Sequence, residues 1–178
     1  YMSGISCIIP AYNEAERIGG VLGVLAGHPL VNELIVVDDG STDGTAGRVR
    51  EYPAVRLITH SVNRGKSQAI AAGLRHTTAA TVAFFDADLI GLKPRDVSAL
   101  VEPVLAGSAD MTISLRKNSP WINHVIGVDL FSGERVVARE MLAPHLDELG
   151  RLPRFGLEAF LNRHSLRARQ RIRIVQWP

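Results

Sequence analysis

The chain has 178 residues, of which 46% are hydrophobic, and it carries a formal net charge of +2 at pH 7. This length and composition fit one globular domain and exclude intrinsic disorder, and so small a net charge argues against nucleic acid as a partner. No run approaches the roughly 18 apolar residues of a membrane-spanning helix and no signal-peptide pattern opens the chain, so we expect a cytoplasmic protein.

The first half of the chain alternates short apolar runs with helical patterns. The apolar runs predict buried strands at residues 5–9, 34–37, 55–59 and 81–85. Between them, apolar residues at helical spacing, together with side chains that can cap a helix, predict helices at 14–25, 44–51 and 68–76. Asn13 is expected to cap the first helix, with Glu16 as the other half of a capping box. A further helix opens at Lys93-Pro94. The single cysteine, Cys7, lies in the first strand and fits a reducing compartment.

Repeated strand–helix–strand units predict an α/β fold with a Rossmann-like, mostly parallel sheet and helices on both faces. In such sheets, ligands bind beyond the carboxyl ends of the strands. Polar clusters follow those ends at Pro10–Asn13, Asp38-Asp39, Asn63–Lys66 and Asp86–Asp88. We therefore expect these clusters to converge on one edge of the sheet.

The second half is less regular, but it contains no internal repeat and no linker, so we expect a single domain. Strands are expected near 111–114 and 170–177, and a helix over 155–163. Arginines crowd this end of the chain at Arg163, Arg167, Arg169, Arg171 and Arg173. They fit either the outward face of an ordinary strand and helix, or a surface for anionic headgroups or a phosphorylated acceptor, which would give peripheral membrane contact.

The segment Phe84–Asp88 ends an apolar strand with two carboxylates, Asp86 and Asp88. Residues two apart on an extended backbone face the same side, so both carboxylates can face one space. Mg²⁺ and Mn²⁺ usually bind through one or two carboxylates plus substrate phosphates, so the pair predicts a divalent metal site. A strand running into a solvated acidic loop is the alternative for this segment alone.

Residues 63–66, Asn-Arg-Gly-Lys, are placed between a strand and a helix. Gly65 permits close approach of a ligand to the backbone, and Arg64 and Lys66 add positive charge, as in a diphosphate cradle. A solvated turn with two surface cations is the alternative. The spacing is not that of a Walker loop, and no G-x-G-x-x-G follows the first strand, which disfavours a dehydrogenase. Either Asp38 or Asp39 can accept a hydrogen bond from a nucleotide base.

Taken together, residues 8–14, 36–45, 63–66 and 86–88 resemble, in order and spacing, the motifs of family 2 glycosyltransferases of the GT-A fold. The resemblance implies a nucleotide-diphosphate sugar donor, bound by residues 1–108 of one GT-A domain whose residues 109–178 form the acceptor side. It places around the donor Pro10, Tyr12, Glu14, Asp39, Arg64 and Lys66. It also implies that Asp86 and Asp88 are the metal-binding D-x-D, with Asp88 as the principal ligand of Mg²⁺ or Mn²⁺ and a catalytic residue.

The second half is similar, less specifically, to polyprenyl-phosphate and phosphoglycerate glycosyltransferases. Residues 130–135 resemble their acceptor segment, and 155–158 a stretch ending in glutamate, which implies that Glu158 is a catalytic acceptor-side carboxylate. In an inverting enzyme it can deprotonate the acceptor hydroxyl. The alternatives are that Glu158 caps or salt-bridges a helix near Arg154, and that Asp129 is the base. Relatives use a late histidine as a further metal ligand, but His164 does not match it.

The acceptor implied by this resemblance is a polyprenyl phosphate or another phosphorylated or carbohydrate molecule. Two other functions fit the same features. A sugar nucleotidyltransferase shares the nucleotide-binding architecture but has a glycine-rich first loop, which residues 10–14 lack. A non-catalytic nucleotide-sugar-binding module would keep the donor site without the reaction.

Overall fold

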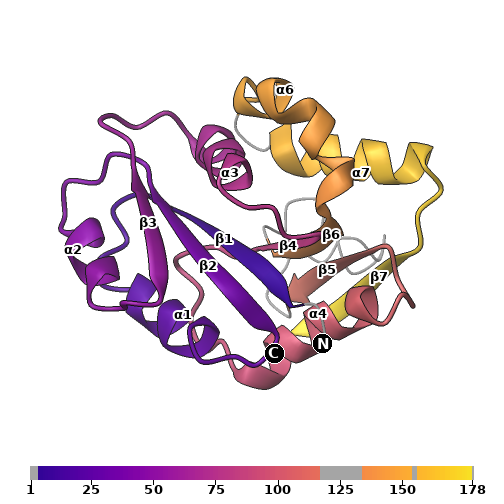
Figure 1. The fold of residues 1–178 in the computed structure, drawn as a ribbon, viewed down its shortest axis with the longest axis horizontal. Coiled ribbons are helices and arrows are strands. Elements are labelled where there is room, and N and C mark those ends of the chain that lie inside the picture. The colour runs from indigo at the N-terminus through magenta and orange to yellow at the C-terminus, as the bar shows by residue number, and fades with distance from the viewer. Residues whose placement is uncertain (1–3, 117–133, 154–155, 178) are drawn as a thin grey trace.

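A seven-stranded sheet forms the centre of the protein in the computed structural model, which describes residues 4–116, 134–153 and 156–177 (Figure 1). Its strands are β1 Ile5–Ala11, β2 Val31–Asp38, β3 Val55–Thr59, β4 Thr81–Phe84, β5 Met111–Arg116, β6 Arg135–Ala138 and β7 Ile172–Trp177. They lie in the order β3-β2-β1-β4-β6-β5-β7. Among these strands only β6 pairs antiparallel, with β4 and β5, so the prediction of a mostly parallel α/β sheet is confirmed.

Helices cover both faces of this sheet, as predicted (Figure 1). They are α1 Ile18–Leu25, α2 Thr45–Arg50, α3 Lys66–Arg75, α4 Pro94–Leu105, α6 Leu146–Gly150 and α7 Gly156–Arg167, with short 3₁₀ turns η1 Arg139–Met141 and η2 Ala143–His145. Apolar residues of α1, α2 and α4 form one core with the strands, and those of α3, α6 and α7 form a second. Cys7 is buried in the first core, and this burial raises the pKa of its thiol. No helix in the described ranges is long and apolar enough to cross a bilayer.

Strand β1 continues through Pro10, where the sequence analysis ended the first strand. The Ile8 carbonyl accepts a hydrogen bond from the Phe85 N–H on the β4 side of β1. Backbone groups alternate between the two sides of a strand, so the Pro10 nitrogen also faces that side. The last β1–β4 pair is Ile8 with Phe84, so Pro10 lies beyond the ladder and its missing N–H breaks no pairing.

Strand β7 is fixed to the start of β5 by a pairing of Asp110 with Arg171. The Asp110 carboxylate accepts hydrogen bonds from the Arg171 backbone N–H at 2.8 Å and from the guanidinium Nε and Nη2 at 3.1 and 2.8 Å. These hydrogen bonds lower the pKa of Asp110 to about 2. Because the pKa in the folded state is below the unfolded value, this pairing stabilises the fold above about pH 4, and the contribution is lost as the pH falls towards 2.

We expect Asp110→Asn to lower stability at neutral pH and to flatten its pH dependence, because the variant has no carboxylate to protonate. Urea unfolding of both proteins between about pH 5 and about pH 3 measures this, and the difference in unfolding free energy should shrink as the pH falls. A constant difference across that range would show that the ionised carboxylate does not stabilise the strand.

Candidate active site

The polar clusters predicted to converge do lie at one edge of the sheet, beyond the carboxyl ends of β1 to β4. There they line a cavity of about 810 Å³. Its lining includes each candidate site residue of the sequence analysis, namely Pro10, Tyr12, Glu14, Asp39, Arg64, Lys66, Asp86, Asp88 and Glu158. The structure therefore brings these residues together, while the role of each one stays a prediction.

The loop after β1 is held by the loop before α2 rather than by its own helix. The Asn13 side chain accepts a hydrogen bond from the Thr42 N–H at 2.9 Å, and the Asn13 N–H donates to Ser41 Oγ at 2.9 Å. Asn13 has a left-handed φ of 54°, and α1 begins only at Ile18 without a side-chain cap. The predicted capping box with Glu16 is therefore wrong, because Asn13 finds its partners across the edge of the sheet.

Of the two adjacent aspartates at the end of β2, only Asp39 lines the cavity. The Asp38 carboxylate is buried and accepts the Ser41 N–H at 3.1 Å, which assigns it to the turn. Asp39 accepts the backbone N–H of Arg64 at 3.0 and 3.1 Å and that of Gly65 at 2.6 Å. Gly65 has φ 94° and ψ 159°, a conformation essentially restricted to glycine. Asp39 thus shapes the predicted phosphate cradle as well as facing the cavity.

Lys66, the first residue of α3, joins the two sides of the cavity. Its Nζ lies 2.8 Å from Asp86 Oδ1 and 3.2 Å from Glu158 Oε1, and Glu158 comes from the first turn of α7. Burial alone would lower the pKa of Lys66, but the charges of Asp86 and Glu158 outweigh it and raise the pKa. The lysine is therefore a cation at neutral pH. Glu158 thus forms an ion pair, but with Lys66; Arg154, the partner considered from sequence, lies outside the described residues.

Negative charge concentrates beside Lys66. Asp88 is exposed, and it makes no hydrogen bond or ion pair with any residue in the described ranges. The pKa of Glu14 is raised by burial and further by the charge of Asp88, against the opposing effect of Arg17, whose Nε lies 2.7 Å from Glu14 Oε2. A cation bound at Asp88 would relieve this repulsion.

The donor atoms here fit a hard divalent cation. The carboxylates of Asp86 and Asp88 line the same cavity, and Asp86 already binds the ammonium of Lys66. Within the described part of the chain, no three His, Cys, Asp or Glu residues are grouped to hold an ion. An ion held by these two carboxylates would complete its coordination with water and with oxygens of a bound phosphate, which is the usual mode for Mg²⁺.

Several predicted features lie away from this cavity. The His164 ring stacks on Phe160 with centroids 3.9 Å apart and does not line the site. Arg171 pairs with Asp110. Asp129 and residues 130–133 lie outside the described residues.

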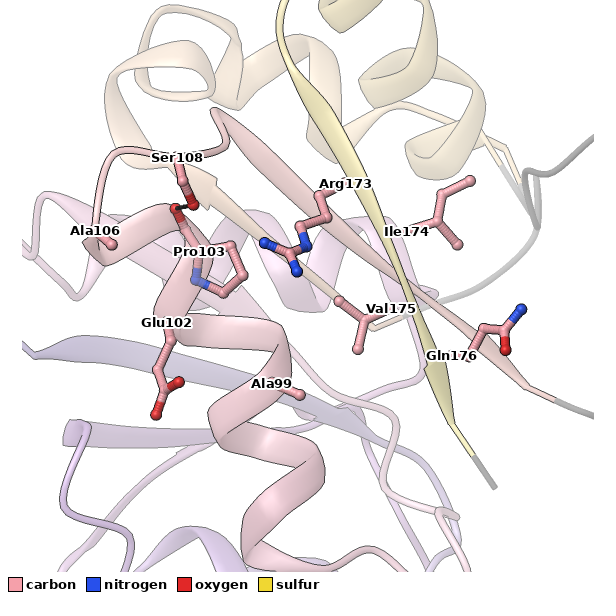
Figure 2. Close-up of a pocket in the computed structure, with 9 residues that line it drawn as sticks. All are labelled: Ala99, Glu102, Pro103, Ala106, Ser108, Arg173, Ile174, Val175 and Gln176. Carbon is pink, nitrogen blue, oxygen red and sulfur yellow. Dashed lines mark hydrogen bonds between the residues drawn. The ribbon is translucent and has the colours of Figure 1, made fainter.

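A second cavity of about 450 Å³ lies between α4 and β7 (Figure 2). It is lined by Ala99, Glu102, Pro103, Ala106, Ser108, Arg173, Ile174, Val175 and Gln176. The Ser108 hydroxyl beside it is already engaged, because it donates to the Pro103 carbonyl at 3.0 Å (Figure 2). None of the four polar clusters contributes to this lining, whereas Arg173 of the C-terminal arginines does.

Two features of the site were not predicted from the sequence. Leu152 and Pro153, between α6 and α7, line the cavity although no motif marks them. His60 is the first residue after β3, and its Nδ1 lies 2.7 Å from Asp39 Oδ1. Its position at the carboxyl end of β3 was the available signal, because polar residues at the ends of β1, β2 and β4 are predicted to belong to the site on the same ground.

Known proteins resemble this chain in sequence. Glucosyl-3-phosphoglycerate synthase of Mycobacterium tuberculosis is 36% identical over 160 residues, which is 82% of this chain and 49% of that protein. Dodecaprenyl-phosphate galacturonate synthase of Rhizobium johnstonii is 31% identical over 123 residues, covering 64% of this chain and 36% of that protein. The chain thus spans less than half the length of these two relatives.

Comparison with solved structures indicates similarity to the same synthase. The crystal structure of the Mycobacterium tuberculosis synthase in complex with Mn²⁺, uridine diphosphate and phosphoglyceric acid superposes with a TM-score of 0.80 at 28% identity, covering 98% of this chain and 68% of that one. The sequence model of glycosyl transferase family 2 matches residues 6–152. With a match over most of its length and a GT-A-like fold, the chain belongs to glycosyl transferase family 2.

Proposed function

We propose that this protein transfers a sugar from a nucleotide-diphosphate sugar to an acceptor, assisted by Mg²⁺ or Mn²⁺. The observation that carries this proposal is the single cavity in which a paired D-x-D, a glycine–lysine turn at a helix start and an acceptor-side glutamate meet. Supporting it, structures of the Mycobacterium tuberculosis relative were obtained with Mn²⁺ and uridine diphosphate or uridine-diphosphate-glucose.

In this proposal the donor lies along the edge of the sheet. Pro10, Tyr12, Glu14 and Asp39 surround the nucleoside, and the diphosphate lies over the turn before α3. The first N–H groups of an α-helix have no partner within the helix, so the start of the 10-residue α3 favours binding of an anion such as this diphosphate. Arg64 and Lys66 add charge, and Lys66 exchanges one carboxylate partner for a phosphate oxygen.

Asp86 and Asp88 would hold the metal, with Asp88 as the principal ligand. When bound, a divalent ion neutralises the charge that collects on the diphosphate as the bond to the sugar breaks. Before the donor binds, the Lys66 ammonium bridges Asp86 and Glu158, so one residue links the donor and acceptor sides of the cavity and holds their carboxylates in place.

Glu158 is the acceptor-side carboxylate in this proposal, and it accepts the proton of an acceptor hydroxyl. A phosphorylated acceptor that attacks through its own anionic oxygen needs no base. The two relatives named above act, by their names, on phosphoglycerate and dodecaprenyl phosphate, which supports an acceptor that carries phosphate.

Peripheral membrane contact belongs to the lipid-linked form of this proposal. Arg163, Arg167 and Arg169 are exposed on α7 and just after it, and they are proposed to face anionic headgroups. We expect the protein to float with vesicles that contain phosphatidylglycerol and to be released by salt. Equal recovery with neutral vesicles would remove this contact from the proposal.

The nucleotide-sugar donor is expected to stabilise the folded protein when it binds, so a thermal-shift assay can identify it. In a thermal-shift panel of UDP-, GDP- and dTDP-sugars with and without Mn²⁺, one nucleotide should raise the midpoint, since a ligand at about 100 times its dissociation constant adds about 2.7 kcal/mol. The same donor, mixed with a phosphorylated acceptor, should release nucleoside diphosphate. A shift without release would support the non-catalytic binding module, and release of pyrophosphate from a nucleoside triphosphate and a sugar phosphate would support the nucleotidyltransferase.

A further inference from the structure

The His60 side chain lies behind the donor side of the cavity. His60 follows β3 directly, and its backbone N–H donates to the Asp38 carbonyl at 2.8 Å. Its Nδ1 lies 2.7 Å from Asp39 Oδ1, and the side chains of His60 and Asp39 are 12% and 4% exposed. A carboxylate at this distance accepts a hydrogen bond, so Nδ1 carries the proton and donates it.

We infer that His60 is a positioning residue for donor binding, which acts by holding the carboxylate of Asp39. This inference rests on the proposed function, because the group that it positions is the one proposed to face the nucleoside. His60 itself does not line the cavity, so in this proposal it does not contact the nucleotide-sugar.

The hydrogen bonds of Asp39 explain why its orientation matters. A carboxylate offers about four acceptor positions. His60 Nδ1 uses one, and the backbone N–H groups of Arg64 and Gly65 use others. The Arg64 N–H is shared between both oxygens, so these three donors fix the plane of the carboxylate beside the cavity that Asp39 lines.

The same contacts connect His60 to the phosphate side of the site. The turn held by Asp39 leads directly into α3 at Lys66. The backbones of the two loops are also close together, since a Cβ added at Gly40 would lie 2.6 Å from the Val62 carbonyl carbon. The loop after β3 thus contacts the turn after β2 closely, and the His60 imidazole adds a further hydrogen bond to the Asp39 carboxylate, which also accepts the N–H groups of Arg64 and Gly65.

A matched set of variants separates positioning from packing. His60→Asn keeps an N–H donor at the same number of bonds from the backbone as Nδ1, His60→Gln moves the donor one bond further, and His60→Phe keeps a ring without a donor. The probe is UDP with Mn²⁺, or GDP or dTDP if one of these gives the larger thermal shift with the wild-type protein. Isothermal titration below the unfolding midpoint of each variant measures the affinity of the folded protein.

We expect His60→Phe and His60→Gln to weaken nucleotide binding about 10- to 100-fold, the effect of losing a hydrogen bond to a charged group, and His60→Asn to stay within about threefold of the wild type. In kinetic assays the loss should appear mainly in the KM for the donor. Equal affinity of His60→Phe or His60→Gln and the wild type would overturn the inference alone, even if these variants unfold at lower temperature. Absence of nucleotide binding by the wild type would overturn the proposed function and the inference with it.

Discussion

Replacement of Asp88 by asparagine is expected to lower sugar transfer by about 100- to 1,000-fold, because charge stabilisation by a metal is worth several kcal/mol and each 1.36 kcal/mol changes the rate about tenfold. The unfolding free energy should change by no more than about 0.5 kcal/mol, as for other exposed substitutions. Asp88 is exposed and makes no hydrogen bond or ion pair within the described part of the chain, so little of the fold depends on it. The measurements are steady-state transfer rates over a range of Mn²⁺ concentrations, and urea unfolding.

Glu16→Gln is a suitable control for this experiment. Glu16 is an exposed acid in the loop after β1 that does not line the cavity, so its loss changes the net charge equally while sparing the D-x-D. We expect its transfer rate and its dependence on Mn²⁺ to match those of the wild type. Full activity of Asp88→Asn with unchanged Mn²⁺ dependence would contradict the assignment of Asp88 as a metal ligand.

The sequence predicted the first half of the fold well because its strands are continuous apolar runs. The apolar run at 34–37, for example, lies inside β2, Val31–Asp38, and is buried. The edge of the site followed from topology, since parallel strands bring their carboxyl ends together wherever they lie in the sequence. The second half was harder, because β6 enters the sheet antiparallel between β4 and β5, and no local pattern specifies that insertion.

The contacts within the site could not be predicted from local sequence patterns either, because the partners are far apart in the sequence. Asn13 is a residue type that commonly caps helices, but its hydrogen-bond partners are 28 and 29 residues away in another loop. Lys66 and Glu158 are 92 residues apart, and each has an ordinary local explanation. His60 gains a role only when β3 lies beside β2. Residue types and strand ends therefore identified the members of the site, and the fold decided which member contacts which.

The ion pair of Lys66 with Asp86 leads to a second prediction, with opposite effects on two ligands. In the ligand-free protein the Lys66 ammonium lies 2.8 Å from Oδ1 of Asp86, whose carboxylate is also proposed to bind the metal. Two cations near one carboxylate repel each other, so Lys66 and Mn²⁺ compete until a diphosphate arrives to pair with both. Lys66→Met should therefore bind Mn²⁺ more tightly than the wild type when no nucleotide is present.

We expect this gain to be about tenfold, because the Coulomb repulsion at a few ångströms amounts to several kcal/mol but a flexible lysine can move away and avoid most of it. The same substitution should weaken binding of nucleoside diphosphate with Mn²⁺ by about 10- to 100-fold, since a charged donor to the phosphates is lost. Mn²⁺ titrations followed by electron paramagnetic resonance, with and without nucleotide, measure both effects. Lys66→Arg keeps the charge and should show no gain in Mn²⁺ affinity. If Lys66→Met binds Mn²⁺ no better than the wild type without nucleotide, the lysine and the metal do not share Asp86, and the coupling of the two sides of the cavity through that ammonium is wrong.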